Sequence, residues 1–323
     1  FPSATPPLGQ PNFENYLPPK QIQFSPPWSV GRKVKFSPGF IWDEYNVNSL
    51  FPGLFTNGPL KNAATFSGGP ATYKARHEAF ASVNSNLFMF GNGAAADDEA
   101  LWYYVGSTNT WTNTTANADF AGDMRDFTGV VFKNGAYYAV NRTAVSNGAN
   151  TRYTLTSTNR TTWAQLVTAA ADEDPNITGS GDELHFLLDI TTTILGSVLV
   201  SIAYNPTGAI WKPVYHTTAA AVNQWGVITA QEYPTIGAPR GCVSWKDASG
   251  NTALFVSTAE ALWFIDLTPN VGTAKAQKIW TYRHPEGTYT GKLIVGPDDA
   301  MYFTDGPNVG CFRWRNDGSR EVH

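Results

Sequence analysis

The sequence is poor in charge and contains no long apolar run. Lys, Arg, Asp and Glu together make up 15% of the 323 residues, and the formal net charge is -4. Because there is no excess of basic residues to meet a phosphate backbone, we expect no nucleic-acid partner. No apolar stretch approaches the roughly 18 residues that a membrane-spanning helix needs, so we expect no membrane span. The most apolar run, Ile194–Ala203, predicts a buried strand instead.

Cysteine is nearly absent, with only Cys242 and Cys311 in the chain. Both stand in the local pattern Gly-Cys-x-x-Trp. Two interpretations are open: a disulfide between them, or two buried thiols that act as small apolar residues. The Cys and His spacing of a metal site does not occur, so the sequence identifies no metal ligand of that kind.

Helical periodicity is also lacking, since the best candidates, Ala219–Val222 and Ala259–Leu262, are too short. Aromatic residues are frequent, at 14% of the chain, and the 29 glycines accompany many Thr and Asn residues. This composition favours short strands and tight turns. The sequence therefore predicts an all-β protein.

The strongest pattern is an internal repeat, in which Ala75–Trp111 and Met124–Trp163 spell the same unit twice. Each copy has an Arg, two or more short aromatic strands and a Thr/Asn turn that ends in Trp. Fainter strand centres near Val200, Phe255 and Tyr302 continue the spacing. A four-stranded unit that recurs about every 40 to 50 residues is typical of a propeller blade. We predict a β-propeller of about six four-stranded blades.

Within the first copy, Arg76-His77, Leu87-Phe88-Met89-Phe90-Gly91, Leu101-Trp102-Tyr103-Tyr104 and Thr108-Asn109-Thr110-Trp111 resemble a kelch repeat. The kelch double glycine is absent, because the sequence has Gly91-Asn92 there. The last unit, Gly296–Gly306, is more similar to the blades of lactonase-like and NHL-like propellers. Ser157–Trp163 resembles a sialidase Asp box with Asn in place of Asp, a motif that forms a structural turn between strands. These resemblances imply the fold and do not imply one activity.

The first 33 residues differ in kind, with eight prolines and little alternation. We predict two regions: an extended Pro-rich arm, 1–33, and a single propeller domain, 34–323. The final unit shows only about three strands, so Gln21–Phe24 can supply its fourth and close the ring. The alternative is that the arm reaches a neighbouring subunit and mediates self-assembly.

Basic residues and histidines precede several predicted inner strands. A ring of such residues around a channel mouth can hold a carboxylate or sulfate. The competing interpretation is that these arginines tie one blade to the next through backbone carbonyls. The candidate ligand-binding residues are Arg76, His77, Arg125, His185 and Arg240.

Acidic clusters are the remaining source of chemistry. Asp97-Asp98-Glu99 lies in a predicted loop, where grouped carboxylates can bind Ca²⁺ or simply be solvated. The same alternatives apply to Asp172-Glu173-Asp174 and Asp182-Glu183. Ca²⁺ is thus the one cofactor that the sequence suggests, and no catalytic residue can be assigned.

Two further sets of residues are candidates for carbohydrate chemistry. Four N-x-Thr sequons are candidate glycosylation sites: Asn113, Asn141, Asn159 and Asn176. The tryptophans that do not follow the repeat are candidate stacking surfaces: Trp28, Trp211, Trp225 and Trp280.

Three functions fit this sequence. We favour a secreted, extracellular, non-catalytic propeller that binds glycan or protein or serves as a subunit of an assembly. The first alternative is a secreted hydrolase or lyase that acts on carbohydrate or lactone at the propeller channel. The second is a structural protein of a virion or cell surface.

Overall fold

The computed structural model describes a large part of the chain between residues 47 and 322. The described residues are 47–51, 54–57, 80–92, 99–105, 107–108, 110–116, 127–147, 150–179, 181–246, 250–269, 272–283, 285, 290–296, 299–305, 311–314 and 320–322. The predicted arm, 1–33, therefore lies outside the described residues. A short hairpin, β1 (Val47–Phe51) and β2 (Leu54–Asn57), precedes the main body.

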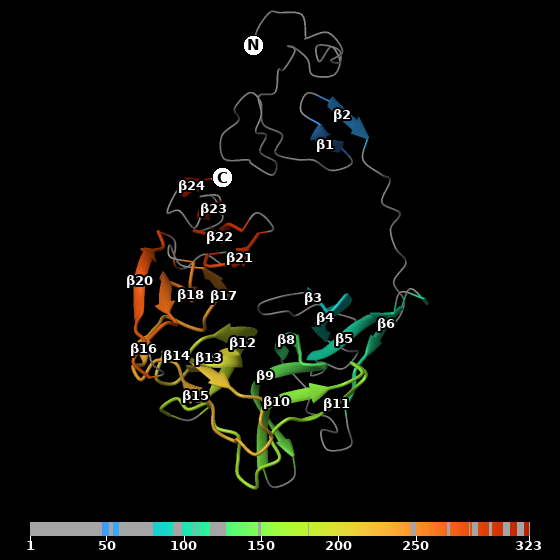
Figure 1. Cartoon of the computed structure of the whole chain (residues 1–323), viewed down its shortest axis with the longest axis vertical. Helices are drawn as coiled ribbons and strands as arrows, with labels where there is room; N and C mark the ends of the chain where they lie inside the picture. The colour runs from blue at the N-terminus through green and yellow to red at the C-terminus, as the bar shows by residue number, and fades with distance from the viewer. Residues whose placement is uncertain are drawn as a thin grey trace, which may run out of the picture.

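Five antiparallel sheets, each built on four strands, follow one another along the chain (Figure 1). The first sheet contains β3 (Phe80–Val83), β4 (Asn86–Asn92), β5 (Glu99–Val105) and β6 (Thr110–Asn113). The second contains β8 (Phe127–Lys133), β9 (Ala136–Asn147), β10 (Asn150–Ser157) and β11 (Thr162–Gln165), with β7 (Thr115–Ala116) parallel to β11.

The third sheet contains β12 (Glu183–Thr192), β13 (Gly196–Asn205) and β14 (Ile210–His216), with β15 (Gly226–Val227) and β16 (Tyr233–Pro234) both paired to β14. The fourth contains β17 (Gly241–Lys246), β18 (Thr252–Ser257), β19 (Ala261–Asp266) and β20 (Ala276–Thr281). The fifth contains β21 (Leu293–Val295), β22 (Met301–Thr304), β23 (Cys311–Trp314) and β24 (Arg320–Val322).

The first strand of each sheet lies against the first strand of the next, so β3, β8, β12, β17 and β21 are the innermost strands. The sheets are arranged around these strands in sequence order (Figure 1). This is the arrangement of a β-propeller, and the predicted all-β propeller fold is confirmed. Five sheets of the predicted six or so fall within the described residues.

Turn chemistry sets the register of the first two hairpins. Asn134 and Gly135 join β8 to β9 with φ of 50° and 84°. Asn84 and Ser85 join β3 to β4 with φ of 48° and 59°. Two residues with positive φ form the turn whose twist matches paired strands, and Asn and Gly tolerate it best.

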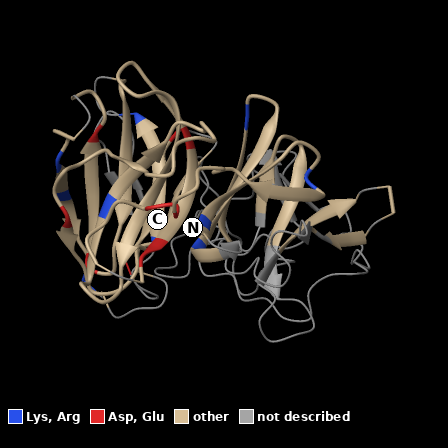
Figure 2. Ribbon diagram, turned by 90° about the horizontal axis from the view of Figure 1, so that it is seen from below, with Lys and Arg blue, Asp and Glu red and all other residues tan. Residues whose placement is uncertain are grey.

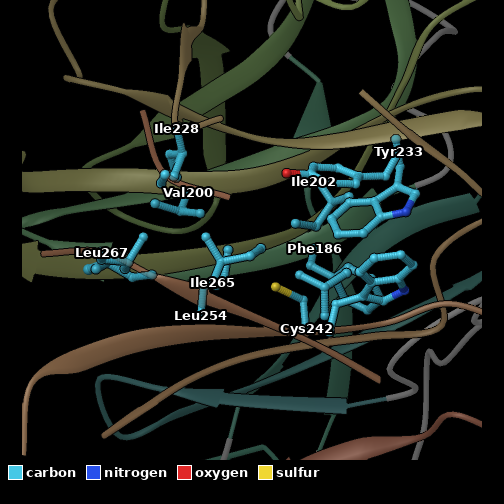
Figure 3. Packing of buried hydrophobic residues seen from close by; sticks show 14 of the residues in the cluster. Phe186, Val200, Ile202, Ile228, Tyr233, Cys242, Leu254, Ile265 and Leu267 are labelled. Atoms are coloured by element: carbon cyan, nitrogen blue, oxygen red, sulfur yellow. The ribbon is translucent and has the colours of Figure 1, made fainter. Parts of the chain in front are cut away.

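Each middle sheet buries both of its faces. In β13, Val200 and Ile202 belong to the cluster toward the fourth sheet, whereas Leu199 and Ala203 belong to the cluster toward the second. Figure 3 shows the first of these clusters, in which Phe186, Val200 and Tyr233 meet Cys242, Leu254 and Ile265. Because alternate side chains of a strand point to opposite faces, such strands must be apolar throughout.

Glycine permits the closest approach between innermost strands. A Cβ atom on Gly129 of β8 would lie 2.5 Å from the backbone nitrogen of Leu187 in β12. A Cβ atom on Gly241 of β17 would lie 2.8 Å from the carbonyl oxygen of Gly291, just before β21. Only glycine fits at such contacts, so these two residues fix how tightly the sheets converge.

The fifth sheet corrects one expectation. Its fourth strand is β24, which pairs with β23 through Phe312 and Val322. The sheet therefore has its fourth strand from the chain's own C-terminal residues and needs none from Gln21–Phe24. In the described part of the chain, no helix has the length and apolarity to cross a membrane.

Candidate functional site

Each of the five sheets has its first strand innermost and the following strands in order outward. The innermost strands therefore begin at the same end of the propeller axis. Thr128 of β8 donates a hydrogen bond to the carbonyl oxygen of Leu184 in β12, so these two strands begin side by side. Arg240, just before β17, likewise donates to the carbonyl oxygen of Thr290, just before β21. We call this end of the axis the strand-start end.

An ion-paired cluster lies where β12 begins. Arg142 of β9 contacts one carboxylate oxygen of Glu183, and His185 Nε2 lies 2.8 Å from the other. The side chains of Arg142 and Glu183 are 17% and 11% exposed, and that of His185 is 1% exposed. Arg142 and His185 each contact one oxygen of the Glu183 carboxylate, and the contact with Arg142 links the second sheet to the third.

The backbone beside His185 is distorted. Phe186 has φ of 64°, which is unusual for a bulky residue, and the register shifts between His185 and Leu188. Ser201 of β13 donates to the carbonyl oxygens of both His185 and Phe186, which supports the distorted segment. Such a bulge redirects the side chains that follow it.

Sequence reasoning placed His185 at a channel mouth, but the structure buries it. Its ring lies 5.7 Å from the ring of Tyr204, in the interface between neighbouring sheets. A buried histidine that shares a carboxylate with an arginine stabilises the sheet contact. It is therefore poorly placed to touch a ligand.

Tyrosines around this cluster are held in the neutral form. Burial raises the pKa of Tyr153 well above its ordinary value, and Asp182 adds to the effect. Burial also raises the pKa of Tyr204, with a further contribution from Glu183. The pKa of Asp182 is raised by burial, although a hydrogen bond from Asn205 opposes the shift.

A second group of charges lies where β17 and β21 begin. A Cβ atom placed on Gly291 would lie 3.4 Å from Cβ of Arg240, so the chain just before β21 runs close to Arg240. Arg240 and Lys292 are both half-buried. Burial lowers the pKa of Lys292, and the nearby Arg240 charge lowers it further.

The carboxylate of Asp305, the residue after β22, accepts hydrogen bonds on both of its oxygens. Asp305 is fully buried, and its two oxygens accept hydrogen bonds from Trp280 Nε1 at 3.3 Å and from the backbone nitrogen of Arg283 at 2.7 Å. Tyr282 lies beside it, hydrogen-bonded to Ser257 at 2.7 Å. Asp305 thus fixes the end of β20 against the fifth sheet.

The sequence left two interpretations of Arg240 open: a tie from one blade to the next, and a part of an anion-binding ring. Its hydrogen bond to the carbonyl oxygen of Thr290, 3.2 Å long, is a tie between sheets. Its positive charge also contributes to lowering the pKa of Lys292, after burial. Of the other candidates in this set, Arg76, His77 and Arg125 lie outside the described residues.

The acidic clusters do not form a calcium site in the described part of the chain, where no group of three or more His, Cys, Asp or Glu side chains could hold a metal ion. Asp97 and Asp98 lie outside the described residues, as does the side chain of Glu99. Glu173 is 2% exposed and accepts hydrogen bonds from Tyr153, Thr154 and Trp225. It is a structural carboxylate, contrary to the expectation of a solvated or metal-binding loop.

The sequons differ in accessibility. Asn141 is fully buried in β9, so a glycan on it is incompatible with this fold. The side-chain nitrogen of Asn176 donates to the carbonyl oxygen of Trp225. Asn159 is exposed, and its oxygen accepts hydrogen bonds from the backbone nitrogens of Thr161 and Thr162. It forms the turn between β10 and β11 that the Asp-box resemblance implied. The side chain of Asn113 lies outside the described residues.

Two of the candidate stacking tryptophans are core residues. Trp211 and Trp225 are fully buried, whereas Trp280 is half-buried. Trp28 lies outside the described residues. Of the described candidates, Trp280 is therefore the one that is not fully buried, and its ring packs against Phe303.

Cys242 is a free, buried cysteine in the structure. Its side chain packs with Phe186, Leu254 and Trp263 between the third and fourth sheets, on the face away from the fifth sheet, which contains Cys311. Burial raises the pKa of the Cys242 thiol far above its ordinary value. For Cys242 the structure fits a buried apolar thiol, and the side chain of Cys311 lies outside the described residues.

Sequence reasoning missed Arg142 and Lys292. Arg142 is hidden because it reaches Glu183 from a different sheet, 41 residues away in the chain. Lys292 had a usable signal, since it precedes an innermost strand just as Arg240 does. Figure 2 shows that the charges of both signs are few and scattered over the described sheets, so no charged face identified them.

Comparison with known proteins gives no family. No family model matches the chain, and no curated protein matches it. Among solved structures, the extracellular domain of a one-component system from B. thetaiotaomicron is similar, with 10% identity, a TM-score of 0.48, and coverage of 80% of this chain and 31% of that one. The chain thus spans about a third of the length of that domain.

Two enzymes show similar levels of likeness. An α-L-arabinanase from Penicillium chrysogenum, complexed with arabinobiose, has 12% identity and a TM-score of 0.47, with coverage of 78% of this chain and 82% of that one. A streptogramin B lyase has 14% identity and a TM-score of 0.43, with coverage of 83% and 72%. Likeness at this level carries no conclusion about activity.

Proposed function

We propose that this protein is a non-catalytic propeller that acts outside the cell and binds a glycan at the strand-start end of its axis. The observation that carries the proposal is the state of the acid and base groups there. Glu183 and His185 are paired with each other, and Asp305 accepts from Trp280 and Arg283. Acid–base catalysis needs a group within reach of substrate whose proton can move. The paired groups serve the contacts between sheets instead.

Binding, in contrast, needs a rigid surface with a few polar groups, and the strand starts supply one. Gly129 and Gly241 bring the innermost strands together, and Arg240 is fixed by its hydrogen bond to Thr290. Preorganised groups bind with less loss of conformational entropy. Trp280, with its indole nitrogen held by Asp305, adds a half-buried aromatic ring near this end. Aromatic rings stack on the apolar faces of sugars, which favours a glycan over a small solute.

The proposal is tested by incubating the full chain with a panel of neutral and acidic polysaccharides. We expect binding in calorimetry, with no new reducing ends and no unsaturated products by mass spectrometry after long incubation. Product that appears in proportion to protein concentration would instead identify the hydrolase or lyase that the sequence leaves as an alternative.

A further inference from the structure

The fifth sheet packs one face against the fourth sheet and exposes a large apolar residue on the other. Leu293 and Val295 of β21 pack against the cluster that contains Trp245 and Phe255. Ile294 points to the opposite face, because alternate side chains of a strand do so. It is 63% exposed, although β21 is an innermost strand. The face of the fifth sheet that is turned away from the fourth is thus suited to an apolar neighbour.

The first sheet also has two apolar faces. Phe88 and Tyr103 belong to the cluster that the first sheet shares with the second. Met89, Trp102 and Trp111 form a separate cluster, to which no other sheet of the described part of the chain contributes. A blade needs two apolar faces when it has neighbours on both sides. The first sheet therefore has the composition of a middle blade, yet the described residues place a sheet on one side of it alone.

The row of sheets has its two ends at these faces (Figure 1). Contacts between innermost strands run from β3 through β8, β12 and β17 to β21, and among the described strands no comparable contact joins β21 to β3. Neither end borrows a strand from the other, since β3–β6 come from residues 80–113 and β21–β24 from residues 293–322. Closing the ring thus requires a further body that packs against both faces.

The chain that precedes the first sheet has the length and the local structure of such a body. The strand β3 begins at residue 80 and β8 at residue 127, 47 residues later, so one sheet with its connections takes about as many residues as lie in 34–79. That segment contains the antiparallel hairpin β1–β2, in which Phe51 pairs with Leu54. Antiparallel hairpins are also the units from which the five sheets are built.

The connections between sheets favour the same placement. The strand β7, which follows the first sheet, runs parallel to β11 at the outer edge of the second. Asp174, which follows the second sheet, pairs in parallel with Gln224, just before β15 of the third. Thr229, which follows β15, pairs in parallel with Gly272, shortly before β20 of the fourth. The chain that leaves one sheet thus runs along the outer edge of the next. The first sheet fits this scheme if the sheet before it in the ring comes from residues 34–79.

We propose that the outward faces of the first and fifth sheets are the docking site of residues 34–79, which close the ring as a sixth sheet with β1 and β2 among its strands. The sequence of the hairpin supplies apolar residues for both faces: Val47, Leu50, Phe51, Leu54 and Phe55. The hairpin is also tethered to the first sheet through residues 58–79. A tether of this kind gives an effective concentration on the order of mM, which favours the chain's own segment over a second copy.

Photo-cross-linking in the full chain tests which segment covers the fifth sheet. The variant Ile294→p-benzoylphenylalanine places a photoreactive group on the outward face, and Ile236→p-benzoylphenylalanine is the matched control. Ile236 is a 73% exposed isoleucine between β16 and β17, whose backbone nitrogen donates to Glu260. We expect cross-links from position 294 to residues 34–79 of the same chain and none to that segment from position 236. Mass spectrometry of mixed isotope-labelled chains identifies both partners.

A stability measurement gives a second, independent readout. Ile294→Thr keeps the branched side chain that strands favour and adds a hydroxyl group, which is costly to bury without a partner. If a sixth sheet covers this position, we expect the Tm to fall by about 5 °C. Ile236→Thr should change the Tm by less than about 1 °C, as at other exposed positions.

Three results would overturn the proposal. Cross-links from position 294 to a differently labelled chain would identify a second copy as the neighbour of the fifth sheet. Cross-links to residues 1–33 would identify the Pro-rich arm instead. If position 294 gives no more cross-links than position 236 and the two threonine variants are equally stable, the outward face of the fifth sheet stays open to solvent.

Discussion

At the scale of single residues, buried charges in this protein are matched by dense hydrogen bonding. Glu173 shows this most fully, because its two oxygens accept from two backbone nitrogens, the hydroxyl of Thr154 and the indole of Trp225. Arg152 does the converse, donating to the carbonyl oxygens of Val167, Ala169 and Ala171. Together they fix the segment that links β11 to β12.

The Glu173→Gln variant should be strongly destabilised. In glutamine, an amide nitrogen, which donates, stands in place of one carboxylate oxygen, which accepts. This nitrogen would face two hydrogen-bond donors, and a buried polar group without a partner costs about 1–3 kcal/mol. We expect the free energy of unfolding to fall by about 2–4 kcal/mol, since one side of the carboxylate loses two bonds. Urea unfolding followed by tryptophan fluorescence measures the change.

Asp172→Asn is the matched control for this variant. Asp172 is exposed and accepts one hydrogen bond, from the backbone nitrogen of Thr151. Its replacement should change stability by less than about 1 kcal/mol, as is usual for exposed polar groups. Equal effects at the two positions would contradict the structural role given to Glu173.

Lys292 should give the protein a measurable pH dependence in the alkaline range. Its pKa in the folded protein lies below that of an unfolded chain, because burial and Arg240 disfavour its charge. Between the two pKa values the unfolded chain binds more protons, so stability rises with pH in that window. Below the pKa of Lys292 in the folded protein, the loss of stability caused by its buried charge is present in full. Above the ordinary lysine pKa, about 10.4, this loss is gone.

The measurement is urea unfolding between pH 8 and the ordinary lysine pKa of about 10.4, for the unchanged protein and for Lys292→Met. The difference in unfolding free energy between them should shift in favour of the unchanged protein as pH rises. A flat difference would mean that Lys292 has an ordinary pKa and is not crowded by Arg240.

At the scale of elements, the approach of the innermost strands decides the packing of the sheets. Gly129→Ala would place a methyl carbon 2.5 Å from the backbone nitrogen of Leu187, where no flexible side chain can yield. Overpacking of this kind costs about 1–3 kcal/mol. We expect a loss of that size or more in thermal or urea unfolding.

Gly208→Ala provides the comparison for this variant. Its Cβ atom would lie 3.3 Å from the side chain of Ile210, which can move. We expect its stability to stay within about 0.5 kcal/mol of that of the unchanged protein, as at most surface positions. If Gly129→Ala were equally harmless, the second and third sheets could not approach each other as closely as the 2.5 Å contact at Gly129 requires.

Elements could be predicted where the sequence repeats. The units Ala75–Trp111 and Met124–Trp163 coincide with the first two sheets, and Trp111 and Trp163 are buried as expected for blade packing. The short strands β7, β15 and β16 were not predicted, because two residues cannot show a period. The strand β24 has only three residues and was also missed, which led to the expectation that the N-terminal arm completes the fifth sheet.

At the scale of the whole molecule, periodicity was enough to predict the fold class but not the site. A propeller follows from the recurrence of four short strands, since each sheet needs neighbours on both faces. The contacts of the strand-start end join residues from different sheets, such as Arg142 with Glu183 and Arg240 with Thr290. No local pattern encodes such pairs, and His185 was accordingly expected at a channel mouth rather than in an interface.

The position of the N-terminal arm is a further expectation to test. We propose that the arm, residues 1–33, lies against the propeller or a second copy of the chain, as its many prolines and aromatic residues suggest. Cross-linking followed by mass spectrometry of mixed isotope-labelled chains separates the two arrangements.

The most direct test of the account is hydrogen–deuterium exchange of the full chain with and without a saturating amount of the polysaccharide that binds in the calorimetric panel. We predict slower exchange on binding in two segments, residues 239–243 and 290–295, where β17 and β21 begin. The outer strands β15 and β16 should exchange at unchanged rates. Protection confined to those outer strands, or conversion of the polysaccharide during the experiment, would contradict a non-catalytic binding site at the strand-start end.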